Sequence, residues 1–251
     1  MTKNTIKKAF HKDFVHNIWK MEVDGYSDKM AVEIRNAETT RPTFVVIDYK
    51  FGNTIMNYTT DSKEWTMEGV QKDYLVLKQV GEQTPTKEGI QIICISEEKQ
   101  VMLSYEYVLL EMFEDYLLVR PRSFTQGGEQ LLRIADGQRF SIQEKVVNEI
   151  PINRVNFPIP YAEMPIFFAD EPIQEQLWLS KIDEKTFAWA YHTKDKSTYD
   201  LHLAISTTDT IVDTEIVQTD LKKMFPQPYF QVDDRLFFLA DNKHEIVSYL
   251  V

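Results

Sequence analysis

A short acidic turn recurs five times along the chain, each time directly before a strand-like run of apolar residues. The copies read YSDKMAVEI, VQKDYLVLK, MFEDYLLVR, IDEKTFAWA and VDDRLFFLA. Aligning them places Lys29, Asp73, Asp115, Lys185 and Arg235 in one column, with spacings of 44, 42, 70 and 50 residues. Self-similarity at a period of about 20–50 residues is typical of repeat architectures. The chain is therefore predicted to be built from copies of one small structural unit.

Each copy predicts four antiparallel strands. The clearest is Asn17 to Tyr58, in which alternating or apolar runs are separated by turns rich in Gly, Asp and Asn. The 70-residue spacing is explained by an insertion that contains four prolines. We expect one domain, 1–251, with approximate units at 17–58, 63–104, 105–142, 166–217 and 225–251 plus 4–12, and an insertion at 143–165.

The last unit lacks a fourth strand, and a spare extended segment precedes the first unit. We predict that Ile6 to His11 pairs with His244 to Val251. Such pairing of the two ends is how a β-propeller removes an open sheet edge. The predicted fold is all-β, a propeller of five four-stranded blades closed by the N- and C-terminal strands.

Composition excludes several classes of function. A net charge of −11 argues against nucleic-acid binding, which needs clustered Lys and Arg. No window approaches 18 consecutive apolar residues, so we expect no membrane insertion. The N-terminus lacks an apolar signal-peptide core, which predicts a cytoplasmic protein. Cys94 is the only cysteine, so an internal disulfide is excluded, and its apolar surroundings predict a buried side chain.

Catalytic and cofactor motifs are absent from the sequence. It has no glycine-rich phosphate loop, no HExxH and no GxSxG, so the catalytic residues are unknown and no cofactor is predicted. His192 and His202 lie on predicted adjacent strands and could approach each other. No third ligand is indicated, so we predict no metal site and treat both as ordinary histidines.

The candidates for ligand binding lie at the ends of the predicted second strands. Arg35, Arg122 and His192 would point to one face of the ring. Arginine forks bind carboxylate or phosphate groups well, but in an acidic chain these arginines could simply pair with Glu38 or Glu129. Both interpretations remain open.

The insertion supplies the candidates for partner binding. Phe157 and Tyr161 alternate with prolines in a stiff, apolar segment. We expect this segment either to border the axial opening of the ring and bind a partner, or to pack flat against the side of the ring with no ligand role.

Large aromatic residues occupy matched places in four predicted first strands. They are Trp19, Trp65, Tyr107 and Trp178. An aromatic binding cage is one interpretation. Because the positions follow the repeat, we favour packing between neighbouring sheets, which would contribute about 2–3 kcal/mol for each buried ring.

The strand order with FVVIDYKFGNTIM resembles the blades of quinoprotein-type and WD-like propellers. The whole chain, with IWKMEVD and AVEIRNAETTRPTFVVIDYKFGNTI, resembles the bacterial DUF4905 family, whose members are uncharacterised. This resemblance implies a propeller without an assigned activity. Two functions are carried forward: a binding or scaffold module for a protein or small ligand, favoured by the lack of catalytic motifs, and a hydrolase or lyase with its site at the central channel.

Overall fold

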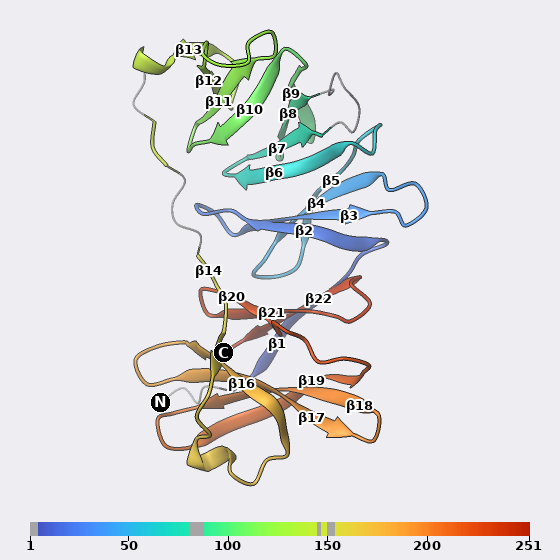
Figure 1. Ribbon diagram of the computed structural model, residues 1–251, viewed down its shortest axis with the longest axis vertical. Helices are drawn as coiled ribbons and strands as arrows, with labels where there is room; N and C mark the ends of the chain where they lie inside the picture. Colours follow the sequence, from blue (N-terminus) through green and yellow to red (C-terminus); the bar gives the residue numbers. More distant parts are fainter. Residues whose placement is uncertain (1–4, 81–87, 145–146, 150–153) are drawn as a thin grey trace. The chain divides into compact units, whose positions relative to one another are not determined.

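The computed structural model describes residues 5–80, 88–144, 147–149 and 154–251. The described residues form five antiparallel sheets of four or five strands and two short 3-10 turns, η1 (Ile142–Glu144) and η2 (Ile166–Phe168), which confirms the all-β prediction. The chain divides into two compact units, unit 1 (Met1–Asp13 and Arg154–Val251) and unit 2 (Phe14–Asn153). Figure 1 shows the strands of each unit.

Unit 2 contains three sheets, each a meander of four strands consecutive in the chain. The first sheet comprises β2 (Asn17–Val23), β3 (Lys29–Arg35), β4 (Pro42–Asp48) and β5 (Thr54–Thr59). The second comprises β6 (Trp65–Gln71), β7 (Tyr74–Gln79), β8 (Gly89–Cys94) and β9 (Lys99–Ser104). The third comprises β10 (Tyr107–Met112), β11 (Tyr116–Pro121), β12 (Gln130–Arg133) and β13 (Arg139–Ser141).

The sheets of unit 2 pack face to face through two apolar cores. One core joins the first and second sheets and includes Phe44, Trp65 and Leu75. The other joins the second and third sheets and includes Val76 and Leu117. Successive residues of a strand point to opposite faces, so Leu75 and Val76 serve different cores. The second strands are consequently apolar in long runs, as the sequence indicated.

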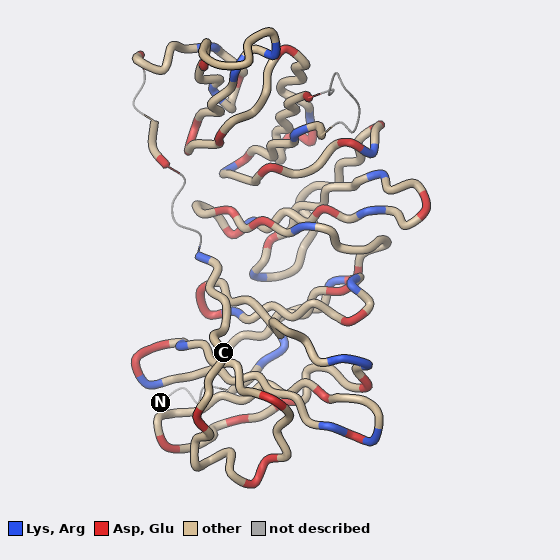
Figure 2. The backbone as a smooth tube through the Cα atoms, in the orientation of Figure 1, with Lys and Arg blue, Asp and Glu red and all other residues tan. Residues whose placement is uncertain are grey.

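Polar contacts link the first hairpins of successive sheets in unit 2. The Lys29 ammonium donates to the Lys72 carbonyl at 2.7 Å, and the Lys72 ammonium pairs with Asp115 at 2.8 Å and with Glu114 at 3.1 Å. Figure 2 shows acidic and basic residues interspersed along the chain. The acidic turn therefore has a structural role: in the second and third sheets, it binds the ammonium group of a lysine from the preceding sheet.

Unit 1 contains two sheets that share a third apolar core, which includes Ala188, Leu203 and Phe238. The fourth sheet has the order β15 (Ile159–Tyr161), β16 (Ile173–Lys181), β17 (Phe187–Asp195), β18 (Thr198–Ser206) and β19 (Ile211–Leu221). The composite sheet has the order β1 (Lys7–Asp13), β22 (Glu245–Leu250), β21 (Arg235–Leu239), β20 (Phe230–Val232) and β14 (Val155–Asn156).

The predicted pairing between the two ends of the chain is confirmed. β1 runs antiparallel to β22, with Lys7 opposite Leu250 and Asp13 opposite Glu245. The Phe10 side chain is buried, and its ring lies 6.2 Å from that of Phe237. β1, from the start of the sequence, is therefore the edge strand of a sheet whose neighbouring strands, β22, β21 and β20, come from the end of the sequence. Closure of all five sheets into one ring remains a prediction.

The second half of the predicted insertion contains two short edge strands, which the sequence did not indicate. Val155 pairs with Val232 at the edge of the composite sheet, and Ile159–Tyr161 pairs with β16 at the edge of the fourth sheet. Proline is tolerated in such edge strands, because one side of the strand makes no ladder hydrogen bonds. Residues 145–146 and 150–153 of the predicted insertion lie outside the described residues.

The predicted inter-sheet packing of aromatic residues is confirmed for three positions and wrong for Trp19. Trp65, Tyr107 and Trp178 each contact a core between two sheets. Trp19 is 68% exposed because it is the extra residue of a β-bulge: Ile18 pairs with Ile34 and Lys20 with Glu33, which leaves Trp19 without an opposite residue.

Candidate functional site

β16 in unit 1 has an irregular pairing with β17, and a pocket lies at this irregularity. Gln174 pairs with His192 and Trp178 with Ala190, so three residues of β16 lie opposite the single residue Tyr191 of β17. Glu175, the first of the three, has a φ of 62°, a left-handed conformation that is rare for residues other than glycine. β16 therefore bulges away from β17 between Gln174 and Trp178.

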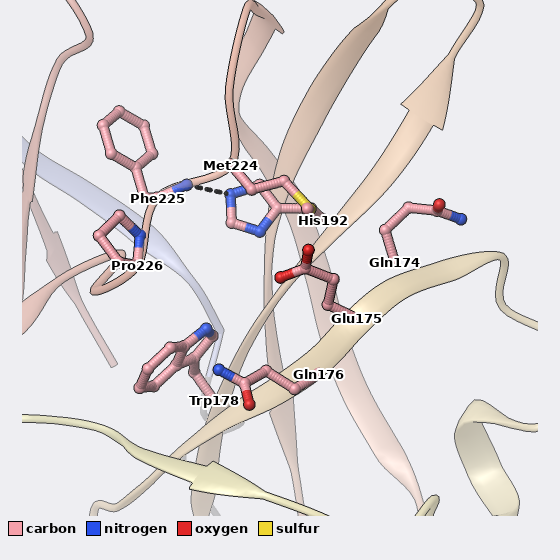
Figure 3. Close-up of a pocket in the computed structure, with 8 residues that line it drawn as sticks. All are labelled: Gln174, Glu175, Gln176, Trp178, His192, Met224, Phe225 and Pro226. Atoms are coloured by element: carbon pink, nitrogen blue, oxygen red, sulfur yellow. Dashed lines mark hydrogen bonds between the residues drawn. The ribbon is translucent and has the colours of Figure 1, made fainter.

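The pocket has a volume of about 300 Å³. Figure 3 shows its three walls: the bulge of β16, the imidazole of His192 on β17, and the segment that leads from β19 towards β20. This size is at the lower end of the range of small-molecule sites, which is about 300–1,000 Å³. The lining residues are Gln174, Glu175, Gln176, Trp178, His192, Met224, Phe225 and Pro226.

His192 forms the buried base of the pocket, with only 2% of its surface exposed. Burial, assisted by the nearby His202, lowers the pKa of His192 from 6.5 to about 4, so the ring is neutral at pH 7. The backbone N–H of Phe225 donates to its Nε2 at 3.2 Å. A neutral imidazole has one N–H, and Nε2 acts as the acceptor here, so Nδ1 carries the proton.

The backbone of Phe225 has a restricted conformation, which holds its N–H in position to donate to His192. Pro226 follows Phe225 directly and restricts it to extended conformations. The Phe225 ring also lies 6.5 Å from the His192 ring. The protonated nitrogen of His192 is consequently determined by the local backbone.

The pocket offers a limited set of interactions. His192 supplies an N–H donor, the amides of Gln174 and Gln176 supply donors and acceptors, and Glu175 supplies a carboxylate. Trp178 and Phe225 add aromatic surface. This combination of an apolar wall and a few convergent polar groups is typical of sites for small ligands. Of the sequence-derived candidates, His192 is the one that lines this pocket.

Arg35 has an ion-pair partner, but not the expected Glu38. Its Nε and Nη2 lie 2.7 Å and 2.6 Å from Oε1 of Glu33, two residues earlier on the same face of β3. Oε2 of Glu33 accepts hydrogen bonds from the Thr66 hydroxyl at 2.8 Å and the Met67 backbone N–H at 2.9 Å. The pair thus joins the first sheet to the second.

The remaining three candidates have varied surroundings. Arg122 in unit 2 donates to the Tyr105 carbonyl at 3.4 Å. In unit 1 the Tyr161 ring packs edge-on against Trp189, with centroids 5.3 Å apart, whereas Phe157 is 59% exposed. A ligand role for the two arginines and a partner role for the two aromatic residues remain predictions.

The two histidines on adjacent strands have separate local contacts. His202 stacks on Tyr191 and contacts the Thr193 hydroxyl at 2.8 Å. Among the described residues, the group of side chains spaced closely enough for a metal ion is instead His11, Asp13 and Glu245, formed where β1 pairs with β22. His11 Nε2 lies 3.0 Å from a Glu245 oxygen, so a hydrogen bond explains this cluster without a metal.

Sequence reasoning missed most of the pocket, because its walls come from segments about 50 residues apart. One local signal was present: the run Gln174 to Gln176 puts three polar residues in a row inside a strand, where alternation is expected. That interruption marks the bulge.

Cys94 is buried, as predicted. No helix among the described residues has the length and apolar character required to cross a membrane.

No protein-family model matches the chain and no curated protein is significantly similar to it, so membership of the DUF4905 family is not shown. The chain weakly resembles a number of solved structures, which include the following three. BamB from Moraxella catarrhalis has 6% identity and a TM-score of 0.35, with 92% of this chain and 84% of that chain covered. A member of the DUF4221 family from Bacteroides vulgatus has 7% identity and a TM-score of 0.33, with 99% of this chain and 98% of that chain covered.

The third is the β-propeller domain of the Trilobed protease from Pyrococcus furiosus, with 12% identity, a TM-score of 0.35, and 93% of this chain and 81% of that chain covered. At these TM-scores the likenesses do not establish a common fold.

Proposed function

We propose that this protein is a binding module of the β-propeller type that holds a small molecule in the pocket around His192. The observation that carries the proposal is a buried, neutral histidine whose protonated nitrogen is determined by the Phe225 backbone, at the base of a pocket of about 300 Å³. A preorganised polar group in a partly apolar pocket supports selective binding, because little ordering is required when the ligand arrives.

The propeller arrangement is part of the proposal and is supported by three properties of the described residues. Every sheet is antiparallel, neighbouring sheets within each unit share an apolar core, and β1 completes a sheet made from the end of the sequence. Rigid stacked sheets would hold the β16 bulge in place, as a binding module requires.

The alternative, a hydrolase or lyase, would need a general base in the pocket. His192 is poorly suited to this task, since its unprotonated nitrogen already accepts the Phe225 N–H and its other nitrogen carries a proton. A catalytic site at the central channel of a ring, or the scaffold role with a protein partner, remains a separate prediction.

The test uses the indole N–H signals in nitrogen-15 NMR spectra of the full chain, with the signal of Trp178 assigned from the Trp178→Phe variant. The probes are choline, N-acetylglucosamine and acetate, which differ in charge. We expect at least one probe to shift the Trp178 signal, and the Gln176→Tyr variant, which places a ring in the pocket, to remove the shift. No shift with any probe, or shifts that persist in Gln176→Tyr, would refute binding at this site.

A further inference from the structure

The charge of the pocket lining is negative. Glu175 is the charged residue among those that line it, and no lysine or arginine is among them. Within the described part of the chain, the Glu175 carboxylate has no hydrogen-bond or ion-pair partner, unlike those of Glu33 and Glu114, and the residue is exposed to solvent at the pocket. An accessible carboxylate that no cation of the protein neutralises favours a ligand that carries the opposite charge.

We propose that the ligand is a small organic cation, with an ammonium group held between the carboxylate of Glu175 and the indole of Trp178. This inference rests on the proposed function. Cations bind to the face of tryptophan more strongly than to other aromatic rings. Trp178 is half-buried, so part of its indole stays accessible from the pocket. In Figure 3 the Glu175 side chain lies between His192 and Gln176, and Gln176 extends towards Trp178.

The backbone at Glu175 explains how its carboxylate reaches the pocket. Glu175 has a left-handed φ of 62°, a conformation that seven other described residues besides glycine share, so the φ alone does not mark a ligand site. At Glu175 this conformation belongs to the β16 bulge, and the bulge places the residue in the lining of the pocket.

The other lining groups are compatible with a cation. His192 is neutral at pH 7 and does not repel a positive charge, while its Nδ1–H can donate to a hydroxyl or carbonyl group on the same ligand. The net charge of −11 adds a long-range attraction. The ligand class is therefore an amine or quaternary ammonium compound that also carries a hydrogen-bond acceptor.

The test compares choline with its neutral isostere, 3,3-dimethylbutan-1-ol, and with the anion 3,3-dimethylbutanoate, by isothermal titration and by the NMR signal of Trp178. Ethanolamine serves as a primary amine. The variants are Glu175→Gln, which removes the charge in the pocket, and Glu184→Gln, which removes an equal charge from the exposed turn after β16, outside the pocket.

We expect choline or ethanolamine to bind at least tenfold more tightly than the neutral alcohol. Glu175→Gln should remove that preference, and Glu184→Gln should retain it. Equal binding of choline and the alcohol, preference for the anion, or an unchanged preference in Glu175→Gln would overturn the cation inference while leaving the pocket as a binding site. If none of these probes binds, the cation inference fails; the proposed function fails with it only if N-acetylglucosamine and acetate also leave the Trp178 signal unchanged.

Discussion

Replacing Arg35 by alanine should strongly destabilise unit 2. The substitution removes two charge-assisted hydrogen bonds from the carboxylate of Glu33, which is fully buried. Bonds to charged groups contribute about 1.5–3 kcal/mol each, and removing one partner of a buried ion pair costs about 3–5 kcal/mol. Since Thr66 and Met67 still donate to the other carboxylate oxygen, we expect the free energy of unfolding to fall by about 4 kcal/mol.

The assay is native-state hydrogen exchange of the Met67 amide, which donates to Glu33, combined with urea unfolding. Glu33→Gln should cost about 2 kcal/mol, because the amide keeps its shape but places an N–H against the guanidinium. In the double variant Arg35→Ala/Glu33→Gln, the loss should be about 4 kcal/mol rather than the additive value of about 6 kcal/mol, since the two side chains interact directly.

An exposed ion pair in the same unit provides the control. Lys50 lies 2.7 Å from Asp28, with side chains 41% and 42% exposed, so Lys50→Ala should cost less than about 1 kcal/mol. If Arg35→Ala costs no more than Lys50→Ala, or if the effects of the Glu33 and Arg35 substitutions simply add, the buried pair does not join the two sheets in the way described.

Three further predictions concern unit 1. The pKa of His192 is lowered from 6.5 to about 4, so between these pH values the unfolded chain binds a proton that the folded chain does not, and the free energy of unfolding falls as the pH drops from about 6.5 to 4. Calorimetry across this range should show that the free energy of unfolding of the native protein falls by about 3 kcal/mol more than that of His192→Gln. Deleting residues 1–12 removes most of β1 and the buried Phe10, and should lower the stability of unit 1 by more than about 2 kcal/mol in thermal unfolding; an unchanged melting temperature would contradict the role of β1. Urea unfolding should show that Tyr161→Ser lowers the free energy of unfolding by about 2 kcal/mol, and that Phe157→Ser, at an exposed position, lowers it by less than about 0.5 kcal/mol. Equal losses in the two variants would show that the Phe157 side chain also stabilises the folded state.

The strands that the sequence predicted correctly are those whose partners are close in the chain. The turn between β6 and β7, for example, is marked by Lys72 and Asp73 and needs only local chemistry. Pairing of β14 with β20 was missed because Val155 meets Val232, 77 residues later, and two residues carry too little pattern to identify a strand. Pairing of β1 with β22 is still more distant, but an unpaired strand at each end indicated it.

The side chains were harder to place than the strands. Trp19 was misplaced because a bulge shifts the alternation of β2 by one residue, and no run of polar residues marks this bulge in the sequence. Arg35 was given the wrong partner because Glu38 was considered and Glu33 was not, although residues two apart in a strand share a face. The pocket depends on the bulge at Glu175, so His192 was the one lining residue chosen in advance as a ligand candidate, while Trp178 was considered for an aromatic cage and assigned to packing instead.

The discontinuity of unit 1 affects the order of events when the protein is synthesised. The ribosome completes all of unit 2 before most of unit 1 exists, and the three meanders of unit 2 use only short-range strand pairings. β1 is made before the other strands of both units but has no partner until β22 emerges more than 230 residues later. During translation this strand is an exposed edge that other chains can pair with, so β1 is where chaperone binding and misassembly should concentrate.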